Sequence, residues 1–78
     1  MVDVTWDASK SKDVAGYNVY RGPNGVTWTK INSGLIAATD YDDSTVANGT
    51  TYYYSATTVN IYGEESKKTA SVKVSVPE

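Results

Sequence analysis

Hydrophobic and polar residues alternate with a period of two along most of this chain. Residues 2–6 read Val-Asp-Val-Thr-Trp, and residues 72–76 read Val-Lys-Val-Ser-Val. Such alternation is typical of β-strands that have one buried face and one exposed face. Residues 35–38 are apolar, but this stretch is too short for a stable helix, and no segment carries a helical hydrophobic stripe. The pattern therefore predicts an all-β protein.

Turn-forming residues separate the β-prone stretches. Gly22-Pro23-Asn24-Gly25 and Asn48-Gly49 combine the residue types that favour tight turns. The stretch 50–60 is the longest run of β-branched and aromatic residues, which favour a pleated surface. Strands are predicted over residues 2–6, 17–21, 26–31, 39–43, 50–60 and 72–76, with a polar loop over 7–13. Short strands at this spacing indicate a β-sandwich or barrel.

Length and composition agree with one small sheet protein. The 78 residues leave room for a single domain spanning residues 1–78. Hydrophobic residues make up 40% of the chain, which is enough to form a core. The aromatic residues are seven Tyr and two Trp with no Phe. Because Tyr and Trp have a polar group on an apolar ring, they suit strands with one buried face and one wet face.

The charge pattern argues against two classes of partner. The net charge is −2, and the seven basic residues are scattered along the chain. Nucleic acid binding requires a concentrated positive surface, so no nucleic acid partner is expected. No apolar run approaches the length of a membrane span, so membrane insertion is not expected either. Met1 leads directly into the first strand pattern, so we do not expect a signal peptide within these residues, which says nothing about secretion if they are a fragment of a longer chain. The chain has no Cys, so the predicted fold contains no disulfide.

The residue types for common catalytic sites are missing. Without His or Cys, the chain lacks the usual general base, the thiol nucleophile and the ligands of zinc sites. The acidic cluster Asp40, Asp42 and Asp43 lacks the ligand spacing and glycine of a calcium loop, so we interpret it as solvated turn carboxylates. We therefore expect no enzyme activity, no cofactor and no metal site.

Several short motifs, taken in order, resemble the fibronectin type III family in the form common in bacterial multidomain proteins. The matching segments are Val4-Thr5-Trp6, Gly16-Tyr17-Asn18-Val19-Tyr20-Arg21, Val46-Ala47-Asn48-Gly49-Thr50-Thr51-Tyr52, and Thr58-Val59-Asn60 followed by Gly63-Glu64-Glu65-Ser66. In the third segment, Val46 and Asn48 stand where the family has leucine and proline. The resemblance extends over nearly the whole chain.

The resemblance implies an immunoglobulin-like β-sandwich of six to seven antiparallel strands. It also implies that Tyr52 is the tyrosine corner, whose hydroxyl bonds to backbone a few residues upstream. The chain begins where the family's second strand is expected, so the first strand has been removed or this variant does without it. The strand at residues 2–6 would then lie at a sheet edge, which invites pairing with another chain.

Alternation divides the strand residues between two faces. The residues expected to face the core are Tyr17, Val19, Tyr52, Tyr54, Ala56 and Thr58. Those expected on the outer, wet face are Asn18, Tyr20, Tyr53, Ser55, Thr57 and Val59. Tyr20 and Tyr53 could pair across adjacent strands, and Trp28 either extends this patch or fills the core. We name Tyr20, Tyr53 and Trp28 as candidate ligand contacts, against the simpler interpretation of ordinary packing on a wet face.

These expectations favour a non-catalytic module of a larger protein. The first hypothesis is a spacer or contact unit that meets neighbouring domains. The second is a module that binds a carbohydrate or a protein through the three aromatic residues. The third is an engineered binding scaffold of the same fold. The resemblance places the parent protein outside the cell or at the cell surface.

Overall fold

A computed structural model of the chain describes residues 2–10, 12–69 and 71–77, and this described part contains six strands and no helix. In chain order the strands are β1 (Val2–Thr5), β2 (Val14–Gly22), β3 (Thr29–Lys30), β4 (Asp40–Asp43), β5 (Thr51–Asn60) and β6 (Val72–Ser75). The all-β prediction is therefore confirmed. In the described residues there is also no helix with the length and apolar character of a transmembrane span.

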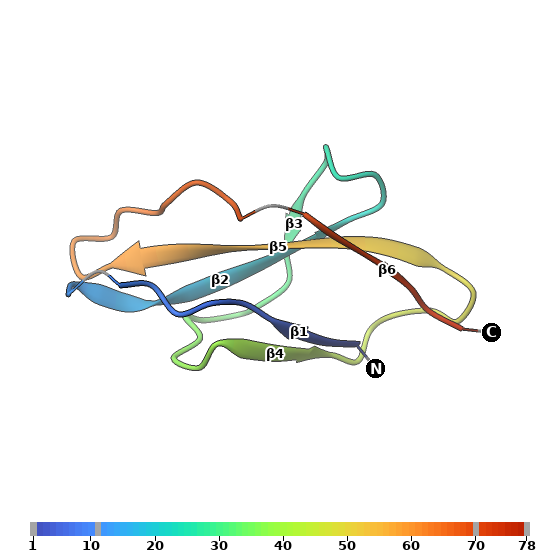
Figure 1. The fold of residues 1–78 in the computed structure, drawn as a ribbon, viewed down its shortest axis with the longest axis horizontal. Helices are drawn as coiled ribbons and strands as arrows, with labels where there is room; N and C mark the ends of the chain where they lie inside the picture. Colours follow the sequence, from blue (N-terminus) through green and yellow to red (C-terminus); the bar gives the residue numbers. More distant parts are fainter. Residues whose placement is uncertain (1, 11, 70, 78) are drawn as a thin grey trace.

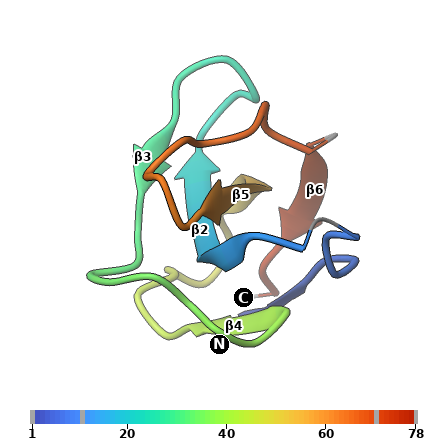
Figure 2. The same ribbon diagram turned by 90° about the vertical axis from the view of Figure 1, so that its left-hand side faces the viewer.

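The strands form two antiparallel sheets that stack as a sandwich. One sheet has two strands in the order β1-β4, and the other has four in the order β3-β2-β5-β6. The two layers lie one above the other, with β4 below the four-stranded sheet in the end-on view (Figure 1 and Figure 2). The predicted sandwich is confirmed.

The core lies between the sheets and is centred on the long β2–β5 pair. Tyr17 and Val19 from β2 and Tyr54 and Ala56 from β5 are all buried there. The Trp6 ring meets the Tyr17 ring edge-on, with 5.7 Å between the centroids. Burying each large apolar side chain contributes roughly 1.5–3 kcal/mol, so these few residues carry much of the stability.

The outer face of the four-stranded sheet is less wet than alternation alone predicts. Ser55 and Thr57, expected to meet solvent, are each 3% exposed. The connection between β5 and β6 crosses this face (Figure 2), and Ser55 Oγ donates a 2.8 Å hydrogen bond to the Thr69 carbonyl. Asn18 and Val59 are buried as well. The expectation of a wet face is thus wrong for four of its six residues. For three of them, Ser55, Thr57 and Asn18, the connection between β5 and β6 supplies the partners Thr69 and Glu65.

The strand predicted over residues 26–31 is reduced to the two residues of β3. Asn24 explains the shortening, because its Oδ1 accepts hydrogen bonds from the Val26 and Thr27 amides at 2.9 Å each. Side-chain to backbone bonds of this kind compete with a strand ladder. Trp28 therefore lies outside β3, in the loop that leads into it.

Candidate functional site

The three candidate ligand contacts lie around one end of the β2–β5 pair. Tyr20 is opposite Ser55, whereas Tyr53 is opposite Gly22, so the two tyrosines are diagonal neighbours on the same outer face. The direct cross-strand pair that we expected is not formed. Both side chains are half-buried, and neither is in the core.

Trp28 lies beside Gly22, on the same outer side as Tyr53. Gly22 and Tyr20 are two residues apart on β2, so a Cβ added to Gly22 would point to the same face of the sheet as the Tyr20 side chain. This Cβ would lie 3.6 Å from Trp28 Cε3. Trp28 therefore extends the outer side instead of filling the core. Gly25 packs against the Tyr53 ring, since a Cβ there would lie 3.4 Å from Tyr53 Cδ2. The loop between β2 and β3 thus holds both aromatic rings at the surface.

Tyr20 is engaged by the segment that follows β5. The Nζ of Lys68 lies 4.4 Å from the centroid of the Tyr20 ring, which is a cation–π contact. The Tyr20 hydroxyl donates a hydrogen bond to Glu65 Oε2. A ligand that stacked on this ring would have to displace Lys68. The ligand-contact role of the three aromatic residues stays a prediction.

Glu65 is the centre of a polar network that the sequence did not single out. Its Oε2 accepts hydrogen bonds from Thr57 Oγ1, the Tyr20 hydroxyl and Asn18 Nδ2. The Thr57 hydrogen bond is the main cause of a lowered Glu65 pKa, followed by that from Tyr20. Asn18 is held in turn by Asn32, whose Nδ2 donates to Asn18 Oδ1 at 2.9 Å. The polar outward positions of β2 and β5 were a signal that this face needs a polar partner.

A second network lies between the sheets and joins Arg21 to Asp43. Arg21 Nη1 lies 2.8 Å from Asp43 Oδ2, and the side chain of Asp43 is 3% exposed. The Tyr54 hydroxyl donates to the same oxygen at 2.8 Å, and Thr45 Oγ1 donates to Oδ1 at 2.7 Å. Burial by itself raises the pKa of Asp43, but the hydrogen bonds from Thr45, Tyr54 and Arg21 outweigh it and lower this pKa to about 2.

Tyr52 forms the corner that its motif predicts. Its hydroxyl accepts a 2.9 Å hydrogen bond from the Ala47 amide, five residues upstream. Gly49 occupies the tight turn between them with a φ of 74°, a conformation that favours glycine. The Arg21 guanidinium lies over the Tyr52 ring, 4.9 Å from its centroid.

Comparison with solved structures identifies a relative that shares the fold of this chain. No model of a known protein family matches the chain. A crystal structure of a Fn3-like protein from Clostridium thermocellum superposes with a TM-score of 0.81 at 34% sequence identity, and the match covers 97% of this chain and 76% of that one. The chain belongs to the fibronectin type III family.

A second relative is an amylopullulanase from Thermoanaerobacterium saccharolyticum. It is 37% identical to this fibronectin type III domain over 67 residues, which is 85% of the domain. The match spans 5% of the length of the amylopullulanase. The domain therefore corresponds to a small part of a much larger protein.

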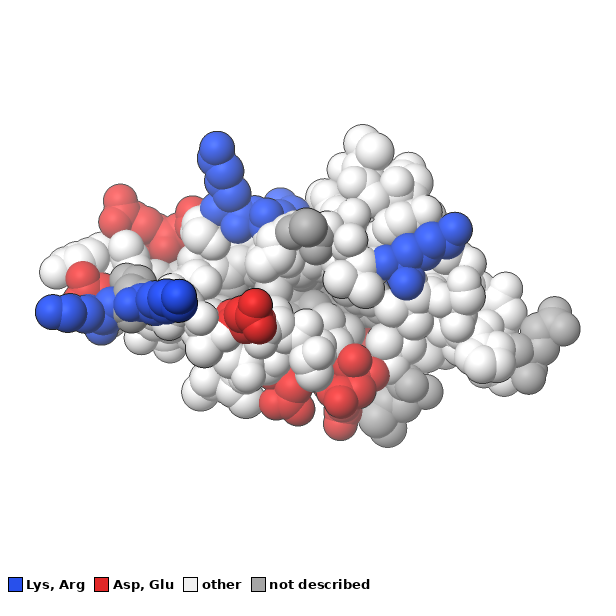
Figure 3. All heavy atoms as spheres, viewed as in Figure 1, with Lys and Arg blue, Asp and Glu red and all other residues white. Residues whose placement is uncertain are grey.

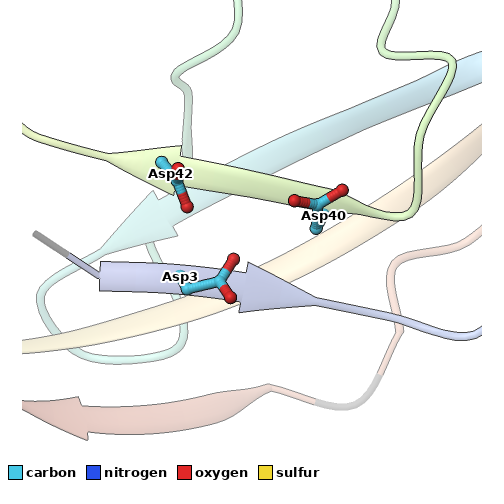
Figure 4. Close-up of side chains that lie close together, drawn as sticks. All are labelled: Asp3, Asp40 and Asp42. Carbon is cyan, nitrogen blue, oxygen red and sulfur yellow. The ribbon is translucent and has the colours of Figure 1, made fainter.

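The acidic cluster of this fibronectin type III domain differs from the one inferred from sequence. Asp40 and Asp42 lie on β4 and not in a turn, and Asp3 on β1 joins them on the outer surface of the two-stranded sheet. The carboxylate oxygens of the three residues lie within 4.8 Å of one another (Figure 4). Asp43 points to the opposite face. Alternation along β4 was the signal that separates Asp43 from the other two.

The carboxylates crowd one another at the surface. Asp3 and Asp42 are directly opposite in the ladder, where like charges destabilise the pairing. The pKa of Asp3 is raised by desolvation first, and then by its hydrogen bond with Asp42 and by the charges of Asp42 and Asp40. Acidic side chains also gather at the lower edge of the molecule, where β1 and β4 lie (Figure 3). This cluster gives the two-stranded sheet a negative outer surface.

The tyrosine corner leads to a test of the face assignment. Tyr52→Phe removes the hydroxyl that accepts the Ala47 amide, so we expect a loss of about 0.5–1.5 kcal/mol in the free energy of unfolding. Tyr53→Phe is the matched control, because the Tyr53 ring, which this substitution keeps, packs against Gly25. We expect it to cost much less. Urea unfolding of the two variants compares them, and equal losses would contradict the assignment.

Proposed function

We propose that residues 1–78 form one non-catalytic accessory module, a spacer or contact unit beside other domains of a larger secreted or cell-surface protein. The observation that carries the proposal is the match to 5% of the length of an amylopullulanase, a stretch of the size of one domain. A domain that recurs inside a long enzyme at 37% identity is suited to an accessory role.

The charged side chains Arg21, Asp43 and Glu65 bond to other residues of the same domain, which supports this proposal. Arg21 and Asp43 bond to each other between the sheets, and Glu65 accepts three hydrogen bonds on the outer face. These charged groups are occupied by an ion pair and by hydrogen bonds within the domain. They do not line an open cleft, where reactive groups are usually found. The geometry therefore favours a stabilising role for them.

The proposal predicts that the isolated 78-residue chain has no hydrolase activity. Purified protein incubated with pullulan and with amylose should release no more reducing sugar than a heat-unfolded sample. Asp40→Asn and Asp42→Asn variants serve as controls, because they change the exposed acidic cluster. Reproducible turnover that either substitution abolishes would overturn the non-catalytic assignment.

A contact role through the aromatic surface is the second candidate function. It is favoured by the placement of Tyr53 and Trp28 on one side, where the loop between β2 and β3 holds them half-exposed. Replacing Tyr20 and Tyr53 with Ser should abolish saturable binding to a glycan or a neighbouring domain while leaving the fold nearly unchanged. A screen that finds no saturable partner for the unmodified chain would leave the spacer role.

A further inference from the structure

Two of the five asparagines of the chain precede a glycine, at Asn24-Gly25 and at Asn48-Gly49. An asparagine in this position can deamidate without an enzyme, because no side chain shields the backbone nitrogen of the glycine. That nitrogen attacks the carbonyl carbon of the asparagine side chain and closes a succinimide ring. Asn24 and Asn48 are both exposed and lie in connections between strands. Exposure therefore does not distinguish the two sites, but their hydrogen bonds do.

The reacting nitrogen of the second site is occupied. The Gly49 N–H donates to the Val76 carbonyl at 2.9 Å and to the Pro77 carbonyl at 3.2 Å. Attack requires this nitrogen to lose its proton. The loss would break both hydrogen bonds and would place a negative charge against two carbonyl oxygens. The fold is therefore expected to protect Asn48 from deamidation.

The first site has the opposite arrangement. Among the described residues, the Gly25 N–H donates no hydrogen bond to an acceptor. The side-chain oxygen of Asn24 accepts the Val26 and Thr27 amides, at 2.9 Å each. These two donors keep the side chain turned towards the residues that follow it, and so towards Gly25. They also stabilise the negative charge that develops on this oxygen during the attack, as paired backbone amides do in an oxyanion hole.

We propose that Asn24 is a site of spontaneous deamidation in the folded domain, whereas Asn48 is protected. The Gly25 nitrogen gives its proton to the solvent and bonds to the side-chain carbonyl carbon of Asn24. The bond from this carbon to Nδ2 breaks, and ammonia leaves. Water then opens the ring at either carbonyl and gives aspartate or isoaspartate. One water is consumed for each ammonia released, and nothing is oxidised or reduced. This proposal does not depend on the proposed accessory function.

The isoaspartate product would alter the aromatic surface. It lengthens the backbone by a methylene group and moves the carbonyl that accepts the Val26 and Thr27 amides into the main chain. The next residue, Gly25, packs against the Tyr53 ring, and the same loop leads into Trp28. We therefore expect the surroundings of both aromatic rings to change as the modification accumulates.

Peptide mapping of the unmodified chain tests the site directly. The chain is incubated in mildly alkaline buffer, once folded and once in concentrated guanidinium chloride, and is then digested with trypsin. Asn24 falls in the peptide of residues 22–30 and Asn48 in that of residues 31–67. Mass spectrometry follows deamidation at each position, and an isoaspartate methyltransferase identifies the isoaspartate product. We expect similar rates at the two sites in denaturant. Folding should slow Asn48 at least about tenfold and change Asn24 by less than about threefold.

Two variants link the reaction to the loop. Asn24→Gln and Asn48→Gln each remove one reacting side chain, because glutamine cyclises far more slowly. The Trp28 indole signal in NMR spectra should change with age in the unmodified chain and in Asn48→Gln, and should stay constant in Asn24→Gln. The proposal is overturned if folding slows Asn24 as much as Asn48 or more. It is also overturned if the Trp28 signal ages equally in both variants.

Discussion

Asp43→Ala is expected to lower the free energy of unfolding by about 3 kcal/mol, because it removes one partner of a buried ion pair. The substitution leaves the Arg21 guanidinium without its 2.8 Å partner between the sheets. It also deprives the Tyr54 and Thr45 hydroxyls of the acceptor they share. Three donors thus lose one carboxylate, which explains an effect larger than that of a surface substitution.

Urea unfolding, followed by Trp fluorescence, measures this loss. Asp42→Ala is the matched control, since Asp42 is the adjacent residue on the same strand but is exposed. Its removal relieves carboxylate crowding, so we expect a change within about 0.5 kcal/mol in the stabilising direction. Similar losses in the two variants would show that the ion pair does not stabilise the sandwich.

The hydrogen bonds that Asp43 accepts from Thr45, Tyr54 and Arg21 also make the stability depend on pH. The pKa of Asp43 is about 2 in the folded chain, against an ordinary value of 3.8. A lowered folded-state pKa stabilises the fold fully above the unfolded value, and the stabilisation is lost as pH falls from about 4 through about 2. The part attributable to Asp43 is about 2 kcal/mol. Unfolding measured from pH 6 to pH 2 should show this loss in the unmodified chain and a smaller one in Asp43→Asn.

Gly22→Ala is expected to lower the free energy of unfolding by about as much as Asp43→Ala, because the added methyl group has no room. A Cβ at this position would lie 1.9 Å from the Thr27 carbonyl oxygen and 3.1 Å from its carbon. Because the obstacle is backbone, the loop between β2 and β3 has to move as a whole. That loop is held by the Asn24 side chain, which accepts the Val26 and Thr27 amides. We expect a loss of about 3 kcal/mol, which lowers Tm by more than about 10 °C.

Gly34→Ala is the control for this substitution. Nothing lies within 4 Å of a Cβ added there, and its φ is not positive. We expect no loss, and a gain of up to about 1 kcal/mol from the restricted unfolded chain. Thermal unfolding by circular dichroism compares the two variants. If the Gly22→Ala variant has the same Tm as the unmodified chain, the close approach of Thr27 to β2 does not exist in solution.

The positions of most strands could be predicted from local patterns. Apolar alternation at residues 2–6 and 72–76 identifies β1 and β6, because a strand with one buried face requires a period of two. The motif that ends at Tyr52 predicted the corner, because its glycine and tyrosine act within a few residues of each other. Local chemistry also explains the failure at β3, where Asn24 forms side-chain bonds that the strand pattern does not reveal.

The surroundings of each face were decided by the tertiary structure. Alternation placed Ser55 and Thr57 on the outer face, but only the path of the connection between β5 and β6 shows that Thr69 and Glu65 cover them. Likewise, sequence grouped Asp43 with Asp40 and Asp42, whereas stacking of the sheets brings Asp43 to Arg21. A period of two tells which residues share a face, but contacts between distant segments decide what covers that face.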